Sequence, residues 1–272
     1  NEEALIVEGL NRIYNYLQSL QSGFDFELLV VNDGSKDRTG ELADEFAREH
    51  DKTRVIHHKI NLNLGSALKT GFMNARGSVI IVLDIDMSYD VDHIEKLLNT
   101  QVNTQADIVL ASPFMKGGKI TAVPVLRKFL SKGANRFLRM AAQEKFSTYT
   151  SIVRAYKSHF IKGVNLKTTD YEISTEILYK AMVLRARIVE IPAHLDWTAQ
   201  NKHRGKRASG IRLFKNFLSS LMSGFIYRPY IFVMGIGTIL LIISLYIIIW
   251  IFINTFHILP EQPILVRLQH TS

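Results

Sequence analysis

The sequence predicts an α/β fold with a mostly parallel sheet and helices on its faces. Apolar runs of strand length alternate with stretches of helical spacing from residue 2 to residue 191. This alternation is typical of βαβ units. In addition, the apolar run at residues 79–83 is followed at once by two carboxylates, and ligands of open α/β sheets bind at the carboxyl ends of strands. The chain has 272 residues, enough for one large domain or two small ones.

The helices are predicted from apolar side chains spaced so that they share one face. We expect helices at residues 2–20, 37–50, 66–75, 92–100, 123–140 and 171–184. Their apolar faces include Val7, Leu10, Ile13, Leu17 and Leu20 in the first, Leu42, Ala43 and Phe46 in the second, Ile94, Leu97 and Leu98 in the fourth, and Ile173, Ile177, Leu178 and Met182 in the last.

The strands are predicted from short apolar runs bounded by turn residues. They are residues 26–31, 54–58, 79–83, 107–111 and 187–191, with 146–154 as a further candidate. A continuous apolar run indicates a strand covered on both faces, so we expect residues 79–83 to be buried on both. Right-handed crossovers then bring Asp33 and Asp84, which follow two of these strands, to one edge of the sheet.

Asp84 and Asp86 are the strongest candidate site residues. In an extended chain, residues i and i+2 point to the same side, so both carboxylates can reach one point beyond the strand. Two hard oxygen ligands suit Mg²⁺ or Mn²⁺ holding a diphosphate. Taken alone, the pair favours a solvated turn after a strand, since such triplets are common.

Composition excludes some functions. The absence of cysteine rules out disulfides and thiolate metal sites. The formal net charge of +8 is concentrated beside an apolar tail, which favours a membrane over nucleic acid as the partner. The pair His57-His58 is interpreted as strand-end surface and not as zinc ligands. Because the chain begins abruptly at Asn1, we expect a first strand upstream.

The C-terminal part has the pattern of a membrane protein. Residues 198–260 contain no acidic residue, and residues 211–227 form an amphipathic stretch suited to a membrane surface. Residues 230–259 carry no charge, and a transmembrane helix needs about 20 apolar residues. The alternative is a buried core helix. We therefore expect a folded domain at 1–200, a basic amphipathic segment at 201–228, a transmembrane helix at 229–259 and a tail at 260–272. The basic flank places the folded domain on the cytoplasmic side.

Four motifs in order resemble a family 2 glycosyltransferase of the GT-A fold, which is Rossmann-like. They are Asn1-Glu2-Glu3, Val31-Asn32-Asp33-Gly34-Ser35, Asn61-Leu62-Asn63-Leu64-Gly65 and Asp84-Ile85-Asp86. Later stretches are similar to the dolichyl-phosphate mannose synthase branch: Lys116-Gly117-Gly118, Arg127, Arg154-Ala155-Tyr156, Tyr171-Glu172 and Glu190-Ile191-Pro192. The resemblance covers residues 1–209.

The resemblance implies an inverting, metal-dependent transfer of a sugar from a nucleotide sugar, such as GDP-mannose or a UDP-sugar, to a membrane polyprenyl phosphate, dolichyl or undecaprenyl. Glu2 and Asp33 match positions that hold the nucleoside. Asp84 and Asp86 match the metal and diphosphate site. The remaining matches are Arg127 near the phosphates, Glu172 as a catalytic residue, and Arg154 at the acceptor phosphate.

A basic cluster precedes the amphipathic stretch, where a membrane-anchored phosphate must pass. It consists of Lys202, Arg204, Lys206 and Arg207. Arg forks and Lys charges recognise phosphate, so this cluster is a candidate acceptor site. Equally, it could serve only to bind anionic headgroups and set the topology.

Some residues depart from the family pattern and leave the sugar and the acceptor open. Ser88 stands where a Gln is common, and Pro113 where the branch has Arg. A hydroxyl acceptor would need a general base, for which Asp170, Glu172 and Glu176 are candidates. A processive synthase usually carries Gln-x-x-Arg-Trp, which is absent. A catalytically inactive membrane scaffold is the non-enzyme alternative.

Overall fold

The computed structural model describes residues 1–20, 23–142, 144–198 and 229–255. The chain divides into two compact units, residues 1–227 and 228–272, each treated by itself below. The first contains α1 (Ile6–Ser19), β1 (Leu28–Asn32), α2 (Thr39–Glu49), β2 (Thr53–His57), α3 (Leu64–Asn74), β3 (Val79–Val82), α4 (Asp92–Thr104), β4 (Ile108–Ser112), β5 (Lys119–Thr121), α5 (Val125–Ala141), β6 (Arg154–Lys157), α6 (Ser158–Gly163), α7 (Ile173–Val183), β7 (Ile188–Pro192) and β8 (His194–Asp196).

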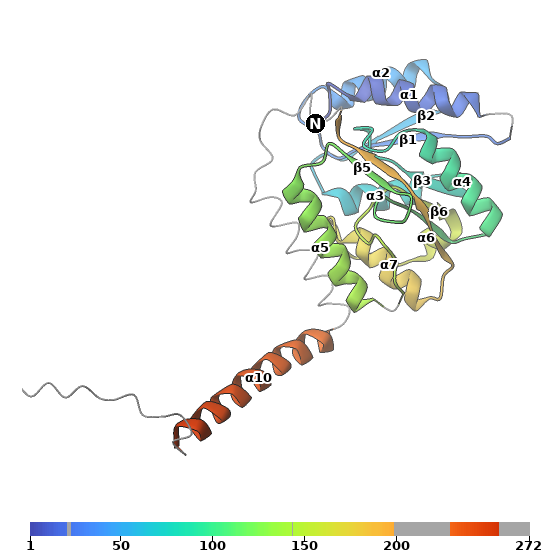
Figure 1. The fold of residues 1–272 in the computed structure, drawn as a ribbon. Coiled ribbons are helices and arrows are strands. Elements are labelled where there is room, and N and C mark those ends of the chain that lie inside the picture. The colour runs from blue at the N-terminus through green and yellow to red at the C-terminus, as the bar shows by residue number, and fades with distance from the viewer. Residues whose placement is uncertain (21–22, 143, 199–228, 256–272) are drawn as a thin grey trace, which may run out of the picture. The chain divides into compact units, whose positions relative to one another are not determined.

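The central sheet has the strand order β3-β6-β4-β7 (Figure 1). β4 and β7 are parallel, whereas β6 runs antiparallel to both of its neighbours. Two further pairs are parallel, β1 with β2 and β5 with β8. The expected α/β architecture is confirmed, with β6 as the exception to parallel pairing.

Helices cover both faces of the central sheet. Along β4, Ile108 and Leu110 point to a core shared with α3, α6 and α7, while Val109 and Ala111 point to a core shared with Leu97 of α4. This alternation is the two-residue period of a strand. β4 is fully buried because both faces are packed. A third core joins α1 and α2 to β1 and β2.

Two expectations about strands are wrong. β3 is half-buried along its length because it ends the strand order and has a single paired neighbour, β6, among the described residues. Residues 146–153 form an irregular loop, and the strand begins only at Arg154. Side chains satisfy the backbone of this loop: Ser147 N–H donates to the Glu190 carboxylate at 2.9 Å and Tyr149 N–H to Asn135 Oδ1 at 2.6 Å.

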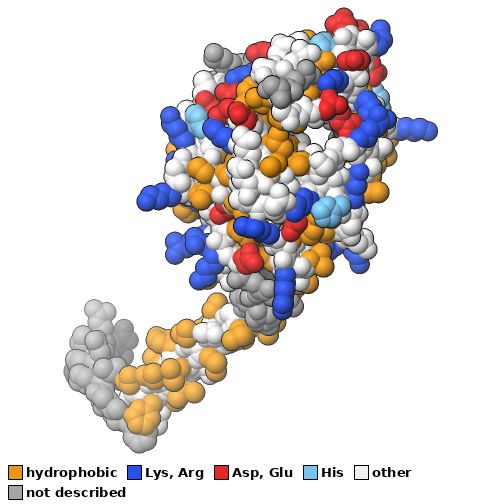
Figure 2. Space-filling view, turned by 90° about the vertical axis from the view of Figure 1, so that its right-hand side faces the viewer, with side chains coloured by type: hydrophobic (Ala, Val, Ile, Leu, Met, Phe, Trp, Pro, Cys, Tyr) orange, Lys and Arg blue, Asp and Glu red, His pale blue; other side chains and the backbone are white. Residues whose placement is uncertain are grey.

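The second unit contains α10 (Pro229–Thr255), which has no acidic or basic residue. Residues 233–255 are long and apolar enough to cross a membrane, and 23 residues span about 35 Å against a hydrocarbon core of about 30 Å. Figure 2 shows its apolar side chains. The expected segments at 201–228 and 260–272 lie outside the described residues.

Candidate active site

Four charged side chains converge where β3 ends. Asp84 is partly buried. The desolvation of its carboxyl, followed by the charges of Asp86 and Glu2, raises its pKa to about 7. The guanidinium of Arg127 acts in the opposite direction. Because such effects weaken with distance, Glu2, Asp84, Asp86 and Arg127 share one small region. The residues come from the N-terminal segment, the end of β3 and the start of α5.

The donor set of this region fits a divalent cation. The region contains three carboxyl groups, those of Glu2, Asp84 and Asp86, and one guanidinium, so its acidic groups outnumber its basic ones. In the described part of the chain, no group of three or more His, Cys, Asp or Glu side chains is arranged to hold a metal. A pair of carboxylates is sufficient for Mg²⁺, which takes one or two of them and completes its shell with water and substrate phosphates. Asp84 and Asp86 supply that pair.

Ser88 holds Asp86 in place. Its backbone N–H and its hydroxyl both donate to Asp86 Oδ1, at 3.0 and 2.7 Å. Between them, Met87 has a positive φ of 53°, an uncommon conformation for a residue with a side chain. Ser88, interpreted from the sequence as a poorer metal ligand, is thus a buried residue that orients the carboxylate.

Gly9 permits α1 to pack directly against the loop between the two aspartates. A Cβ atom at this position would lie 2.7 Å from the Ile85 carbonyl oxygen and 2.9 Å from Ile85 Cδ1. Contacts below 3.0 Å require a shift of the backbone. The only signal in the sequence is a glycine inside an amphipathic helix, where it costs stability relative to alanine.

Asp33 lies in the turn that follows β1, and one oxygen of its carboxylate is hydrogen-bonded to other residues of the protein. Asp33 Oδ1 accepts hydrogen bonds from His58 Nδ1 at 2.7 Å and from Leu62 N–H at 2.9 Å. The side chain of His58 is largely buried, so it is not the surface residue that we expected. The next residue, Gly34, has a φ of +63°, and a Cβ there would come within 2.3 Å of the Ile60 carbonyl carbon. The turn therefore packs tightly against the segment that leads into α3.

Two other contacts bring the predicted motifs together. Glu2 N–H donates to Thr39 Oγ1 at 2.7 Å, which fixes the N-terminal segment to the start of α2. At the start of α3, a Cβ on Gly65 would lie 2.5 Å from the Thr169 carbonyl carbon. This contact places the third motif beside the loop that precedes Glu172, a partly exposed residue directly before α7.

Arg127 is positioned by an aromatic ring. Its guanidinium carbon lies 4.0 Å from the centroid of Trp197, a buried side chain. Trp197 follows β8, and its backbone N–H donates to the carbonyl oxygen of Thr121 in β5 at 3.1 Å. β8 also contacts the loop after Asp86, since Asp196 N–H donates to Ser88 O at 2.9 Å. The three-residue strands β5 and β8 therefore join the carboxylate loop to α5, and they are too short for their pattern to be recognised in the sequence.

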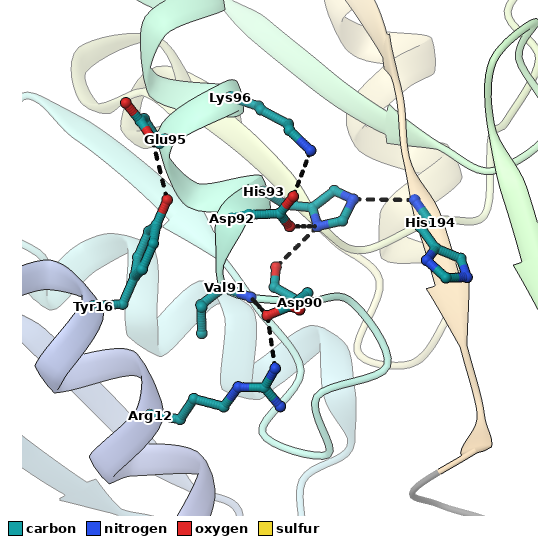
Figure 3. A network of polar contacts seen from close by, with 9 residues as sticks. All are labelled: Arg12, Tyr16, Asp90, Val91, Asp92, His93, Glu95, Lys96 and His194. Atoms are coloured by element: carbon teal, nitrogen blue, oxygen red, sulfur yellow. Dashed lines mark hydrogen bonds and ion pairs between the residues drawn. The ribbon is translucent and has the colours of Figure 1, made fainter.

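A polar network fixes the chain that leaves this loop (Figure 3). Within α4, His93 Nδ1 donates to Asp90 O at 2.9 Å, and its Nε2 accepts from His194 N–H of β8 at 3.1 Å. Arg12 of α1 reaches Asp90 at 2.9 Å. Residues 90–93 are thereby tied to α1 and β8 at once.

Glu176 is a poor candidate for a general base. It is 3% exposed, and its carboxylate accepts from Lys167 N–H and Thr168 N–H, each at 2.8 Å. Burial alone would raise its pKa, but Lys180 and these hydrogen bonds lower it to about 2. Such a carboxylate is fully ionised near neutral pH and already saturated with donors.

Arg154 is not at the surface where an acceptor phosphate would bind. It is 0% exposed, and its guanidinium donates to Ser174 O at 2.8 Å and Tyr149 O at 2.9 Å. The sequence reasoning failed here because an arginine at the start of a strand has the same pattern whether its side chain points outward or into the core. The basic residues Lys202, Arg204, Lys206 and Arg207 lie outside the described residues.

Comparison with known proteins identifies relatives of this chain. The chain is 34% identical over 194 residues to a dolichol-phosphate mannosyltransferase of Pyrococcus furiosus, covering 71% of this chain and 53% of that protein. It is 31% identical over 172 residues to a polyprenol monophosphomannose synthase of Mycolicibacterium smegmatis, covering 61% and 64%. For an undecaprenyl-phosphate mannosyltransferase of Micrococcus luteus, the identity is 30% over 172 residues, covering 61% and 70%. The chain thus spans about half to two thirds of the first two relatives.

The fold has solved counterparts. A glucosyl-3-phosphoglycerate synthase from Mycobacterium tuberculosis, crystallised with Mn²⁺, UDP and glucosyl-3-phosphoglycerate, superposes with a TM-score of 0.60 at 17% identity, covering 82% of this chain and 76% of that one. This likeness confirms the GT-A architecture. Residues 1–164 match the family model described as glycosyl transferase family 2. The resemblance inferred from the four motifs is confirmed, and the chain belongs to glycosyl transferase family 2.

Proposed function

We propose that this protein transfers a sugar, with inversion, from a nucleotide sugar to a polyprenyl phosphate at a membrane. The observation that carries the proposal is the convergence of Glu2, Asp84, Asp86 and Arg127, an acidic site with one cation beside it. Three relatives named for prenyl-phosphate mannosyl transfer support the acceptor class.

Each residue of the site has a role in this proposal. Asp84 and Asp86 would hold Mg²⁺ or Mn²⁺, which neutralises the charge that develops on a departing nucleoside diphosphate. Ser88, which donates to Asp86 Oδ1, would hold that carboxylate in position. Arg127, backed by Trp197, provides a fixed positive charge for the phosphate oxygens. Glu2 and Asp33 would bind the nucleoside.

The acceptor side needs no strong base. A phosphate monoester is mostly ionised near neutral pH, because its second pKa is about 6. The saturated carboxylate of Glu176 fits this chemistry, since it has no capacity to take a proton from a hydroxyl acceptor. Lys202, Arg204, Lys206 and Arg207 would bind the acceptor phosphate, and Glu172 would face the transferred sugar. α10 would anchor the chain, with the catalytic unit on the cytoplasmic face.

The test uses the full chain in nanodiscs that contain a polyprenyl phosphate, supplied with radiolabelled GDP-mannose or UDP-glucose. We expect labelled lipid with one donor, loss of transfer with EDTA, and recovery with Mn²⁺. Asp86→Asn should reduce transfer by about 100-fold or more, as for other lost electrostatic groups, and weaken Mn²⁺ binding. The exposed Asp51→Asn is the matched control. Mn²⁺ binding without turnover of any donor would favour the inactive scaffold, and transfer that survives both EDTA and Asp86→Asn would contradict the metal site.

A further inference from the structure

Asp33 is held in place by the largely buried side chain of His58. The backbone N–H of His58 donates to Asn32 O at 2.9 Å, which brings its ring beside the turn after β1. Its Nδ1 donates to Asp33 Oδ1 at 2.7 Å, because an ionised carboxylate can only accept. On the far side of the ring, Nε2 lies 2.9 Å from Thr70 Oγ1 of α3. The ring is therefore held at both nitrogens, and Nδ1 carries a proton whether the imidazole is neutral or charged.

The first oxygen of the Asp33 carboxylate has both of its lone pairs in use. Oδ1 accepts from the His58 ring and from the Leu62 backbone N–H, and one carboxylate oxygen offers two lone pairs. The backbone of the same residue is held as well, since Asn61 Nδ2 donates to Asp33 O at 3.1 Å. The loop at residues 58–62 thus keeps the carboxylate in one orientation.

The second oxygen is left for a ligand. No donor contacts Asp33 Oδ2 among the residues that the structure describes, and the side chain is 18% exposed. The N-terminal segment joins this turn to the acidic site: Lys36 N–H donates to Asn1 Oδ1 at 2.7 Å, and the next residue, Glu2, acts on Asp84. Oδ2 is therefore a single acceptor beside the region in which the donor diphosphate would bind.

A single acceptor discriminates between nucleobases. On its Watson–Crick edge, guanine presents two adjacent donors, N1–H and N2–H, which match the two oxygens of one carboxylate, whereas uracil presents N3–H alone. With Oδ1 occupied, guanine leaves one donor unpaired and uracil leaves none. We infer that His58 is a specificity-determining residue, which restricts the donor to a uridine nucleotide by occupying Oδ1. This inference rests on the proposed function and names the nucleoside of its donor.

The test is calorimetry on the full chain in detergent, with Mn²⁺ present and UDP, GDP or CDP as the titrant. We expect the parent to bind UDP about tenfold more tightly than GDP, from one hydrogen bond left unmade. His58→Leu frees a lone pair of Oδ1, so the ratio of the GDP Kd to the UDP Kd should fall toward 1. His58→Asn, whose amide can donate in place of Nδ1–H, should keep the parent's ratio. Thr70→Val is the matched control, because it removes the other contact of the ring and leaves Oδ1 occupied. Both constants come from one protein, so a change in the folded fraction cancels in their ratio.

Asp33→Asn should change the preferred base. The donors of His58 and Leu62 both need an oxygen, so the carbonyl of the new amide takes the place of Oδ1 and its nitrogen that of Oδ2. The amide nitrogen then opposes the N3–H of uracil and pairs with N3 of cytosine, which is an acceptor. The affinity for UDP should fall about tenfold, and CDP should bind at least as tightly as UDP.

The outcomes separate this inference from the proposed function. A parent that binds GDP as tightly as UDP, or more tightly, would overturn the inference and leave sugar transfer standing. An unchanged Kd ratio in His58→Leu would remove His58 from the choice of base. If the parent binds none of the three nucleotides, the proposed function fails and the inference fails with it.

Discussion

Glu176 should stabilise the catalytic unit by clamping the loop before α7, and Glu176→Gln tests this. The carboxylate accepts hydrogen bonds from two backbone N–H groups, from Thr168 Oγ1 at 2.5 Å and from Lys180 Nζ at 2.5 Å. A drop of its pKa from 4.5 to about 2 corresponds to about 3 kcal/mol at 1.36 kcal/mol per pH unit. Because Lys180 is partly exposed and solvent screens its charge, we expect a loss of about 2 kcal/mol at pH 7.

The pH dependence of this loss has a definite sign. The folded-state pKa lies below the unfolded one, so the stabilisation is complete above about pH 5 and is lost as the pH falls from 4.5 toward 2. The stability difference between the parent and Glu176→Gln should therefore be constant from pH 7 to about pH 5.5 and shrink below pH 4.5. At neutral pH the Glu176→Gln substitution should lower the melting temperature by about 4–8 °C.

Two measurements check this reasoning. Thermal unfolding of the full chain in detergent gives the stability difference, with the exposed Glu45→Gln as control. Hydrogen exchange gives a local readout, because the amides of Lys167 and Thr168 are the donors and should lose protection in the variant. An equal melting temperature for Glu176→Gln and its parent at pH 7, or a difference that persists unchanged at pH 3, would refute the assignment.

Three further substitutions address the site. Gly9→Ala should lower kcat/KM and Mn²⁺ affinity, because a Cβ would press on the Ile85 carbonyl oxygen and shift the backbone between Asp84 and Asp86. The control is Gly163→Ala, whose Cβ meets nothing within 4 Å. A Mn²⁺ affinity equal to the parent's in Gly9→Ala would contradict this reasoning. Trp197→Leu should raise KM for the donor about fivefold, from about 1 kcal/mol of cation–π energy, whereas Trp197→Phe should largely restore it. Asp33→Asn keeps one side-chain oxygen, which can still accept from His58 and Leu62, but it loses the second carboxylate oxygen as an acceptor for the nucleoside. It should therefore weaken nucleotide binding by about 1–3 kcal/mol. Calorimetry that gives the parent's Kd would count against a role in binding.

The sequence was sufficient for the features that depend on local patterns. Amphipathic helices and apolar strands were found because their periods, 3.6 and 2, are visible along the chain. Asp84 and Asp86 were found for the same reason, because an Asp-x-Asp after a strand is a local signal. Asp86 acts on Asp84 because residues i and i+2 after a strand point to the same side, whereas Glu2 was placed near them only by the family resemblance.

The sequence was insufficient where long-range contacts decide. Trp197 meets Arg127 only because β8 pairs with β5, and three-residue strands carry no period. Gly9 is essential only in the presence of Ile85, 76 positions away. Arg154 was misplaced because the carbonyl oxygens that it binds, those of Tyr149 and of Ser174 in α7, leave no trace in the residue pattern around it.

β8 has a mechanical consequence. On one side it is paired with the strand that leads into α5, and on the other it is bonded to the loop that carries Asp86. It is also the last strand among the described residues 1–198. A displacement of β8 would therefore move the loop that carries Asp86 and the strand that leads into α5 together.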